Sequence, residues 1–316
     1  MTPDLADLLD RVRVVALPMR VRFRGIIVRE LALIEGPGGW GEFGAFVEYE
    51  PPEAVHWLAS AVESAYRKPL DAKRDRIPVN ATVPAVPPEE VPELLSRFPG
   101  TRTAKVKVAE PGQTLRDDVA RVDAVRALVP TVRVDANGGW TVEQAVAAAG
   151  ALGPLEYIEQ PCKTVEELAE VRRRIDIPVA ADESIRKADD PLRVVRAGAA
   201  DIAVLKVAPL GGPSALLAIA DQIGIPVVVS SALDSAVGIG TGLQTAAALM
   251  TLSHACGLAT GRLFDEDVAE AVLPVDGYLS VGSVVPDPAR VDGLAASPER
   301  RDWWLRRIIE CYALLR

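Results

Sequence analysis

The amino-acid sequence predicts an α/β protein: a modified TIM barrel of the (β/α)7β type, preceded by a small α+β capping domain. In the middle of the chain, short runs rich in Val, Ile and Ala alternate with charged, Ala-rich helical patterns. Near-continuous apolar strands that alternate with helices are typical of a parallel sheet covered on its outer face, and eight such units close into a barrel. The first 75 residues lack this alternation. A doubly wound open sheet is the alternative for the middle region.

Eight apolar runs are the candidate barrel strands, and the intervals between them are long enough for one helix each. These runs are residues 79–86, 103–109, 131–137, 155–161, 178–184, 201–207, 225–231 and 254–260. We therefore expect the barrel domain to cover residues 77–275.

Residues 1–76 predict the capping domain. Two strand-like runs, 12–19 and 26–36, precede a Gly-rich segment at 38–46 and a helical stretch at 53–68. Two or three antiparallel strands and one helix are typical of a small α+β unit.

The C-terminal segment, residues 276–316, is expected to pack back on this cap. Residues 301–316 form an amphipathic pattern in which Trp, Leu and Ile recur at helical spacing. Packing within the protein explains this pattern better than a location on a membrane surface.

Composition and charge exclude several functions. The chain has 316 residues, 49% of them apolar, and its formal net charge of -9 argues against a nucleic-acid-binding protein. The longest apolar stretch, residues 241–260, is interrupted by polar side chains and is too polar to span a membrane.

The cysteines and the N-terminus indicate a cytoplasmic protein. Cys162, Cys256 and Cys311 lack metal-type spacing and are interpreted as reduced thiols. The acidic N-terminal residues do not form a secretion signal. We expect a monomer or a small homo-oligomer.

Ionisable side chains lie late in the predicted strands, within apolar runs. They are Lys105, Lys107, Asp135, Glu159, Asp182 and Lys206. From Asp135 onwards they follow one another at intervals of 24, 23 and 24 residues, about one strand–helix unit each. Residues repeated once per unit at the carboxyl ends of barrel strands meet on one face, and buried charges are costly unless paired or bound to metal. A single residue of this kind can merely mark a strand end, but five in successive units predict a site.

The three carboxylates suit a hard divalent cation. Mg²⁺ prefers oxygen ligands and keeps positions open for water or substrate, and Mn²⁺ can substitute for it. Zn²⁺ is less suitable because no His or Cys belongs to the set, and His56 and His254 are better explained as structural residues.

A metal between two lysines predicts removal of a proton from the carbon next to a carboxylate, so the expected substrate is a small carboxylate. Loss of that proton gives a dianionic enediolate, which a cation stabilises. A lysine acts as the base when it is neutral. Strand alternation puts Lys105 and Lys107 on the same face, and we expect their repulsion to favour a neutral amine.

Five motifs together resemble the muconate-lactonizing-type subgroup of the enolase superfamily, and the resemblance covers nearly the whole chain. The motifs are Lys-Val-Lys at 105–107, Asp-Ala-Asn at 135–137, Ile-Glu-Gln-Pro at 158–161, Ala-Asp-Glu-Ser at 181–184 and Leu-Lys-Val at 205–207. By this resemblance, the magnesium ligands are Asp135, Glu159 and Asp182. The lysines that flank the substrate from opposite faces are Lys107 and Lys206. The residues expected to contact these ligands and lysines, without being metal ligands or catalytic residues themselves, are Lys105, Asn137 and Glu183.

Within a subgroup of cycloisomerases, racemases, dipeptide epimerases and o-succinylbenzoate synthases, the chain is similar to the short actinobacterial members of the last group. The similarity lies in residues 16–26, 35–51 and 135–140 and in a short cap. It implies syn-dehydration of 2-succinyl-6-hydroxy-2,4-cyclohexadiene-1-carboxylate to o-succinylbenzoate, a step of menaquinone biosynthesis. It also implies that Lys107 removes and returns the proton, while Lys206 stays protonated over the ring.

An acidic loop leaves other activities open. Asp265, Glu266 and Asp267 follow the eighth run and resemble the Asp-x-Asp of dipeptide epimerases, which binds a substrate ammonium group. We favour the interpretation of a solvated loop, so a dipeptide epimerase or an N-succinylamino acid racemase is the alternative. A barrel used only for binding is disfavoured because both lysines and all three carboxylates are present.

Four further side chains are expected to contact the substrate. Arg22 and Arg24 lie in a cap loop that can close over the barrel mouth and meet the succinyl carboxylate. Alternatively, they are surface charges that flank a buried Phe23. Ser230 and Ser231 end the seventh run.

Overall fold

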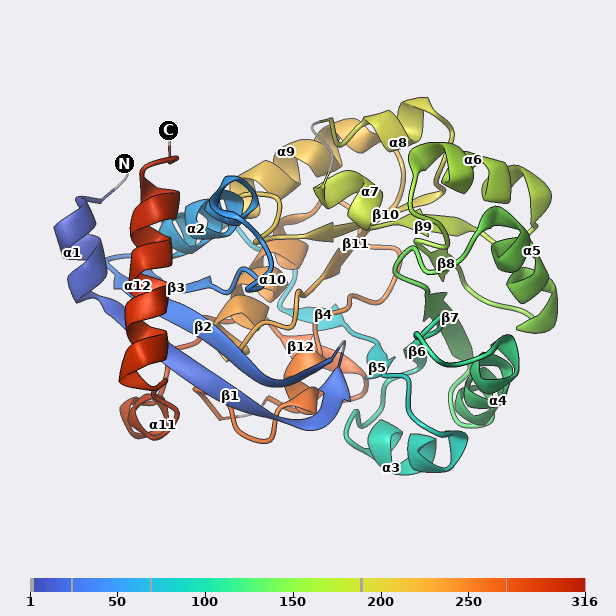
Figure 1. Cartoon of the computed structure of the whole chain (residues 1–316), viewed down its shortest axis with the longest axis horizontal. Helices are drawn as coiled ribbons and strands as arrows, with labels where there is room; N and C mark the ends of the chain where they lie inside the picture. The colour runs from blue at the N-terminus through green and yellow to red at the C-terminus, as the bar shows by residue number, and fades with distance from the viewer. Residues whose placement is uncertain (1–2, 24, 69, 188–189, 271, 316) are drawn as a thin grey trace.

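The computed structural model describes residues 3–23, 25–68, 70–187, 190–270 and 272–315. Its main parts are a three-stranded antiparallel sheet and a seven-stranded parallel sheet, each packed with helices (Figure 1). This confirms the predicted α/β fold with an N-terminal cap.

The cap is built on the antiparallel sheet. Its strands are β1 (Val12–Phe23), β2 (Ile26–Gly36) and β3 (Gly39–Phe43). Helix α2 (Pro51–Tyr66) packs so closely on this sheet that a Cβ atom on Gly36 would lie 2.2 Å from the Ala65 carbonyl oxygen, and one on Gly41 would lie 2.0 Å from that of Ala61. Glycine is therefore required at both positions.

Helix α12 (Pro298–Tyr312) lies against α2 and near α1 (Leu5–Asp10), so the two termini are close together (Figure 1). The Nε1 of the buried Trp304 donates to Glu30 of β2 at 3.0 Å, and the Tyr312 hydroxyl donates to the Pro3 carbonyl at 2.7 Å. The cap is thus completed by a helix distant in sequence. The domain limits at residues 76 and 275 stay predictions.

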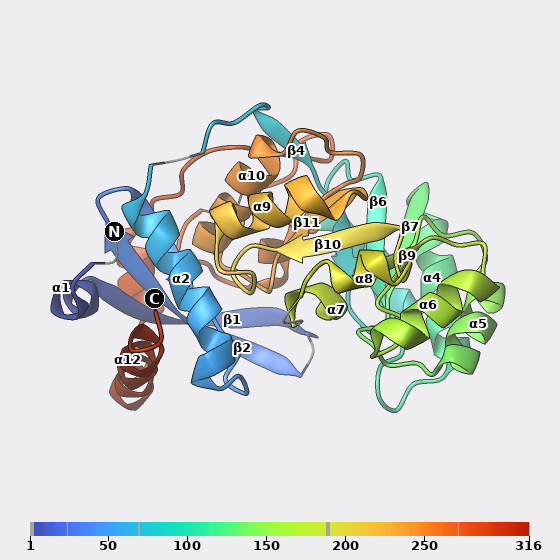
Figure 2. The ribbon, with the colours of Figure 1, turned by 90° about the horizontal axis from the view of Figure 1, so that it is seen from above.

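The seven parallel strands follow one another in sequence order. They are β5 (Ala81–Val83), β6 (Thr103–Lys107), β7 (Thr131–Asp135), β8 (Ile158–Glu159), β9 (Val179–Ala181), β10 (Ile202–Lys206) and β11 (Val227–Ser230). The helices along them are α3 (Val91–Ser96), α4 (Leu115–Arg126), α5 (Val142–Ala151), α6 (Val165–Arg174), α7 (Glu183–Arg186), α8 (Arg193–Arg196), α9 (Pro213–Ile223) and α10 (Ala236–Ala248). Figure 2 shows helices α4, α5, α6 and α8 outside the strands, as expected for a parallel sheet covered on its outer face.

The eighth predicted strand, residues 254–260, is reduced to two isolated parallel bridges. Cys256 pairs with Val79, and Gly257 pairs with Ser230 at the end of β11. These bridges join the segment to both edges of the sheet and close the barrel. A Cβ atom on Gly257 would lie 2.4 Å from Ser230 Oγ, so this approach depends on glycine.

Short elements complete the chain. They are β4 (Arg76–Pro78), which pairs with β12 (Tyr278–Ser280), the 3-10 turns Pro88–Glu90 and Thr260–Leu263, and α11 (Pro288–Gly293). Among the described helices, none combines the length and the apolar character that a membrane span requires.

Candidate active site

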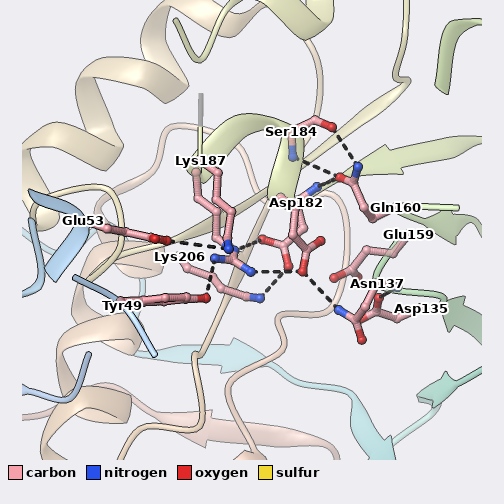
Figure 3. Close-up of polar contacts among 12 residues, drawn as sticks. Tyr49, Glu53, Asp135, Asn137, Glu159, Gln160, Asp182, Ser184, Lys187 and Lys206 are labelled. Carbon is pink, nitrogen blue, oxygen red and sulfur yellow. Dashed lines mark hydrogen bonds and ion pairs between the residues drawn. The ribbon is translucent and has the colours of Figure 1, made fainter. Parts of the chain in front are cut away.

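The register of the parallel strands places the predicted site residues at one end of the barrel. Lys107 is the Cα partner of Asp135, and Asp135 is the partner of Glu159. Asp182 directly follows β9, and Lys206 ends β10. The side chains of Asp135, Glu159, Asp182 and Lys206 point toward one another (Figure 3). Such convergence is what the carboxyl ends of barrel strands produce.

One half of this cluster is held by two lysines. The Nζ of Lys107 lies 2.5 Å from Asp135 Oδ2 and 2.7 Å from Asn137 Oδ1. The Nζ of Lys105 lies 2.9 Å from Glu159 and 3.4 Å from Asp135. Both carboxylates are fully buried. Lys105 and Lys107 therefore share one face of β6, as predicted.

The other half is held by Lys206 and an arginine. Lys206 Nζ lies 2.5 Å from Asp182 Oδ2, and Arg186 Nε donates to Asp182 Oδ1 at 3.0 Å. Arg186 also donates to Glu183, whose same oxygen accepts a 3.2 Å hydrogen bond from Asn137. Burial raises the pKa of Asp182, but Lys206 and Arg186 outweigh it and lower the value to about 2.

Burial and neighbouring charges shift the pKa values of the first half in different directions. Burial and then the charge of Asp135 raise the pKa of Glu159 to about 7, although Lys105 opposes them. Burial acts on Asp135 in the same direction, but Lys107 and Lys105 hold its pKa well below the usual range. Burial lowers the pKa of Lys105, yet Glu159 and Asp135 more than reverse this, and Lys105 is held protonated. The neutral amine expected for the base, Lys107, stays a prediction.

The donor set suits a divalent cation in its chemistry. It comprises three buried carboxylates from consecutive strand ends, and Glu183 Oε2 is buried without a hydrogen-bond partner in the described parts of the chain. Hard oxygen donors of this kind favour Mg²⁺. Over the same described ranges, however, no three acidic, His or Cys side chains are already arranged around a common metal position. The carboxylates face cationic side chains instead.

A small cavity lies between these residues and the cap. Its lining includes Lys107, Lys206, Ser230 and Ser231 from the barrel, and Phe23 and Phe46 from the cap. The Nζ of Lys107 lies 5.4 Å from the centre of the Phe23 ring. The cavity measures about 30 Å³ and adjoins a larger groove to which Phe23 and Lys107 also belong.

Of the two predicted cap arginines, Arg22 is described, and it does not line this cavity. Arg22 is exposed and borders an adjoining groove of about 260 Å³, together with Lys107 and Asn137. Arg24 lies outside the described residues. Phe23 between them is buried, as expected for the alternative interpretation of flanking surface charges.

The acidic loop has a structural role in part. Asp267, which is 8% exposed, accepts from the backbone N–H of Ala236 at 3.1 Å and of Val268 at 2.7 Å. It thereby satisfies the first free N–H of α10. Asp265 is exposed and pairs with Arg20 at 3.1 Å. The interpretation of a solvated loop is therefore wrong for Asp267, and neither aspartate lines the cavity.

This difference predicts unequal effects on stability. We expect Asp267→Ala to lower the free energy of unfolding by about 1–2 kcal/mol, because the N-terminus of α10 loses an acceptor. Asp265→Ala removes only an exposed ion pair and should change it by less than about 0.5 kcal/mol. Chemical denaturation of both variants measures the two values, and equal values would contradict the capping role.

Sequence reasoning missed Gln160 as a site residue. Its Oε1 accepts from the backbone N–H groups of Asp182 and Ser184, at 3.0 and 3.1 Å. Gln160 is fully buried and has φ 40°, a left-handed conformation that is costly for a non-glycine residue. The side chain fixes the turn that carries Asp182. Its position beside Glu159 in the Ile-Glu-Gln-Pro motif was the available signal.

Comparison with known proteins identifies the class first. Residues 14–65 match the family "Enolase N-terminal domain-like", and residues 92–295 match "Enolase C-terminal domain-like". The muconate lactonizing enzyme of Pseudomonas putida has the same fold, with a TM-score of 0.74 and 21% identity over 90% of this chain and 98% of that one. The fold is that of the enolase superfamily.

Relatives that match nearly the whole chain identify one family within the enolase superfamily. The o-succinylbenzoate synthase of Mycobacterium marinum is 73% identical over 98% of this chain and 96% of its own length. That of Mycobacterium tuberculosis is 70% identical over 99% of this chain and 97% of its own. The chain belongs to the o-succinylbenzoate synthase family of the enolase superfamily.

Proposed function

We propose that this protein dehydrates 2-succinyl-6-hydroxy-2,4-cyclohexadiene-1-carboxylate to o-succinylbenzoate in menaquinone biosynthesis, with Lys107 as the acid–base residue. The full-length identity of 70–73% to two synthases carries the choice of reaction. The position of Lys107 and Lys206 on two sides of one buried carboxylate cluster supports the choice of residues.

The proposed reaction needs one base on one face of the ring. The neutral amine of Lys107 takes the proton from the carbon that bears the carboxylate, and the electron pair moves into that carboxylate to give an enediolate. When the enediolate collapses, the ring double bond forms and the hydroxyl leaves from the neighbouring carbon. The ammonium of Lys107 returns its proton to this hydroxyl, so water departs and the ring becomes aromatic.

We propose that Asp135, Glu159 and Asp182 hold Mg²⁺, or Mn²⁺ in its place. The bound cation would supply positive charge to the developing enediolate oxygens. In this structure, Lys107 neutralises Asp135 and Lys206 neutralises Asp182. A bound divalent cation would neutralise these carboxylates instead. Lys107 can then act as the base, and Lys206 can place its ammonium over the other face of the ring.

The supporting residues keep the ligands in place. Lys105 holds Glu159 and Asp135, while Asn137 joins Lys107 to Glu183. Ser230 and Ser231 line the cavity, and Ser231 is 2.5 Å from the Thr260 hydroxyl. We infer that the two serines contact the substrate. The free thiols of all three cysteines are compatible with a reducing cytoplasm, and a monomer or small homo-oligomer stays a prediction.

The test is product formation by the purified protein with Mg²⁺. We expect the ultraviolet absorbance of the cyclohexadiene substrate to be replaced by that of o-succinylbenzoate. N-succinylamino acids and dipeptides, incubated in deuterated water, serve as the comparison. Rapid α-deuteration of a dipeptide without formation of o-succinylbenzoate would instead identify an epimerase.

A further inference from the structure

We propose that Arg186 is a positioning residue, which fixes the carboxylate of Asp182 and ties it to the cap through Tyr49. The inference rests on the proposed function only in taking Asp182 as a metal ligand. Arg186 is the last residue of α7, and its side chain is 3% exposed.

All three nitrogen positions of the guanidinium group are used. Nε donates to Asp182 Oδ1 and Nη2 donates to Glu183 Oε1, both at 3.0 Å, while Nη1 donates to the Tyr49 hydroxyl at 3.3 Å. The acceptors therefore lie on both sides of the boundary between barrel and cap (Figure 3). A planar fork can hold three acceptors at once, whereas a lysine in its place offers a single nitrogen.

Tyr49 is well anchored at its other end. Its backbone carbonyl accepts a hydrogen bond from Arg307 of α12, and its ring packs edge-on against Phe46 at 5.7 Å. The ammonium of Lys187 lies 4.7 Å from the centre of the Tyr49 ring and 3.7 Å from Glu53 of α2. Tyr49 is thus fixed to α12 and α2 of the cap. Phe46, three residues before it, lines the cavity.

Charge explains why an arginine suits this position. Four carboxylates, from Asp135, Glu159, Asp182 and Glu183, face four cationic side chains, from Lys105, Lys107, Arg186 and Lys206. A bound divalent cation balances two of these carboxylates. If Lys105 and Arg186 stay in place, the charges of the other two are balanced as well. Arg186 leaves Asp182 Oδ2, the oxygen that now contacts Lys206, available to the cation.

Phe46 and Tyr49 belong to one cap segment and Phe46 lines the cavity, so the Arg186–Tyr49 bond links the position of this segment to Asp182. We expect a displacement of this segment to displace the Asp182 carboxylate as well. When a residue that hydrogen-bonds to a metal ligand is replaced, the affinity of the protein for the metal commonly changes by about 10–100-fold.

The experiment measures the dissociation constant of Mg²⁺ by calorimetry without substrate. We expect Arg186→Lys, which keeps the charge but loses the fork, to weaken Mg²⁺ binding about tenfold or more. Arg172→Lys is the matched control, because Arg172 pairs with Asp201 on the surface at 2.6 Å. This control should bind Mg²⁺ as the parent does. Binding by Arg186→Lys within about twofold of the parent would overturn the proposal.

Tyr49→Phe tests the tie to the cap and does not depend on the folding of the arginine variant. It removes one hydroxyl and should weaken Mg²⁺ binding in the parent but not further in Arg186→Lys. In hydrogen exchange, Mg²⁺ should protect the Tyr49 amide, which bonds to the Phe46 carbonyl at 3.0 Å, in the parent and not in Tyr49→Phe. Additive effects of the two substitutions, or equal protection in both proteins, would show that no such tie exists.

The test of Arg186 and the test of the proposed reaction can fail independently of each other. A parent protein that binds Mg²⁺ but forms no o-succinylbenzoate overturns the reaction and leaves the role of Arg186 intact. A parent protein that forms the product, with Mg²⁺ binding unchanged in Arg186→Lys, overturns the role of Arg186 alone.

Discussion

Lys107→Arg is expected to reduce dehydration about a thousandfold or more, because the guanidinium group stays protonated near neutral pH and cannot take the proton. The positive charge beside Asp135 is kept, so the fold and substrate binding should survive. The measurement is a comparison of kcat with the substrate dissociation constant. Only kcat should change strongly.

Lys73→Arg is the matched control for this prediction, since Lys73 is exposed and does not line the cavity. It should have the activity of the parent. Lys107→Ala should be as inactive as Lys107→Arg. If Lys107→Arg instead turns over at the parental rate, Lys107 is not the base, and Lys206 on the other side of the cluster becomes the candidate.

Glu159→Gln is expected to lower activity by about a hundredfold and to weaken Mg²⁺ binding about 10–100-fold. Glu159 is fully buried and bonded to Lys105. Glutamine keeps the shape and one oxygen acceptor but removes the charge that would attract the cation. Calorimetric titration with Mg²⁺ and a product assay measure the two effects, and circular dichroism checks the fold.

Chelation tests the same hypothesis without a mutation. Exhaustive removal of divalent ions should abolish turnover, and either Mg²⁺ or Mn²⁺ should restore it. For the Glu159→Gln variant, the matched control is Glu143→Gln, because Glu143 is exposed on α5 and pairs with Arg174 at 2.6 Å. Full activity after chelation would remove the metal from the mechanism.

Much of the site could be predicted because the sequence repeats with the period of the fold. Asp135, Glu159, Asp182 and Lys206 recur once per strand–helix unit, and parallel register converts that spacing into proximity. Alternation along β6 likewise placed Lys105 and Lys107 on one face. These are local rules, and they need no knowledge of the distant chain.

The remaining features depend on contacts between segments far apart in sequence. Tyr49 and Arg186 are 137 residues apart, and Asp267 caps a helix that begins 31 residues before it. The charge state of Lys105 follows from two carboxylates that belong to other strands. No local pattern encodes such distances. The interpretation of a solvated loop was therefore wrong for Asp267.

The position of α12 has a consequence for the order in which the protein matures during translation. Residues 298–312 are synthesised after all the described strands of the barrel and the cap. The cap sheet, although made first, keeps the surface for Trp304 and Ile308 uncovered until residues 298–312 have left the ribosome. Arg307 of that helix also holds the carbonyls of Phe46 and Tyr49, which border the active site. We therefore expect a nascent chain stalled before α12 to lack this cover on the cap and the hydrogen bonds from Arg307 to the segment beside the active site.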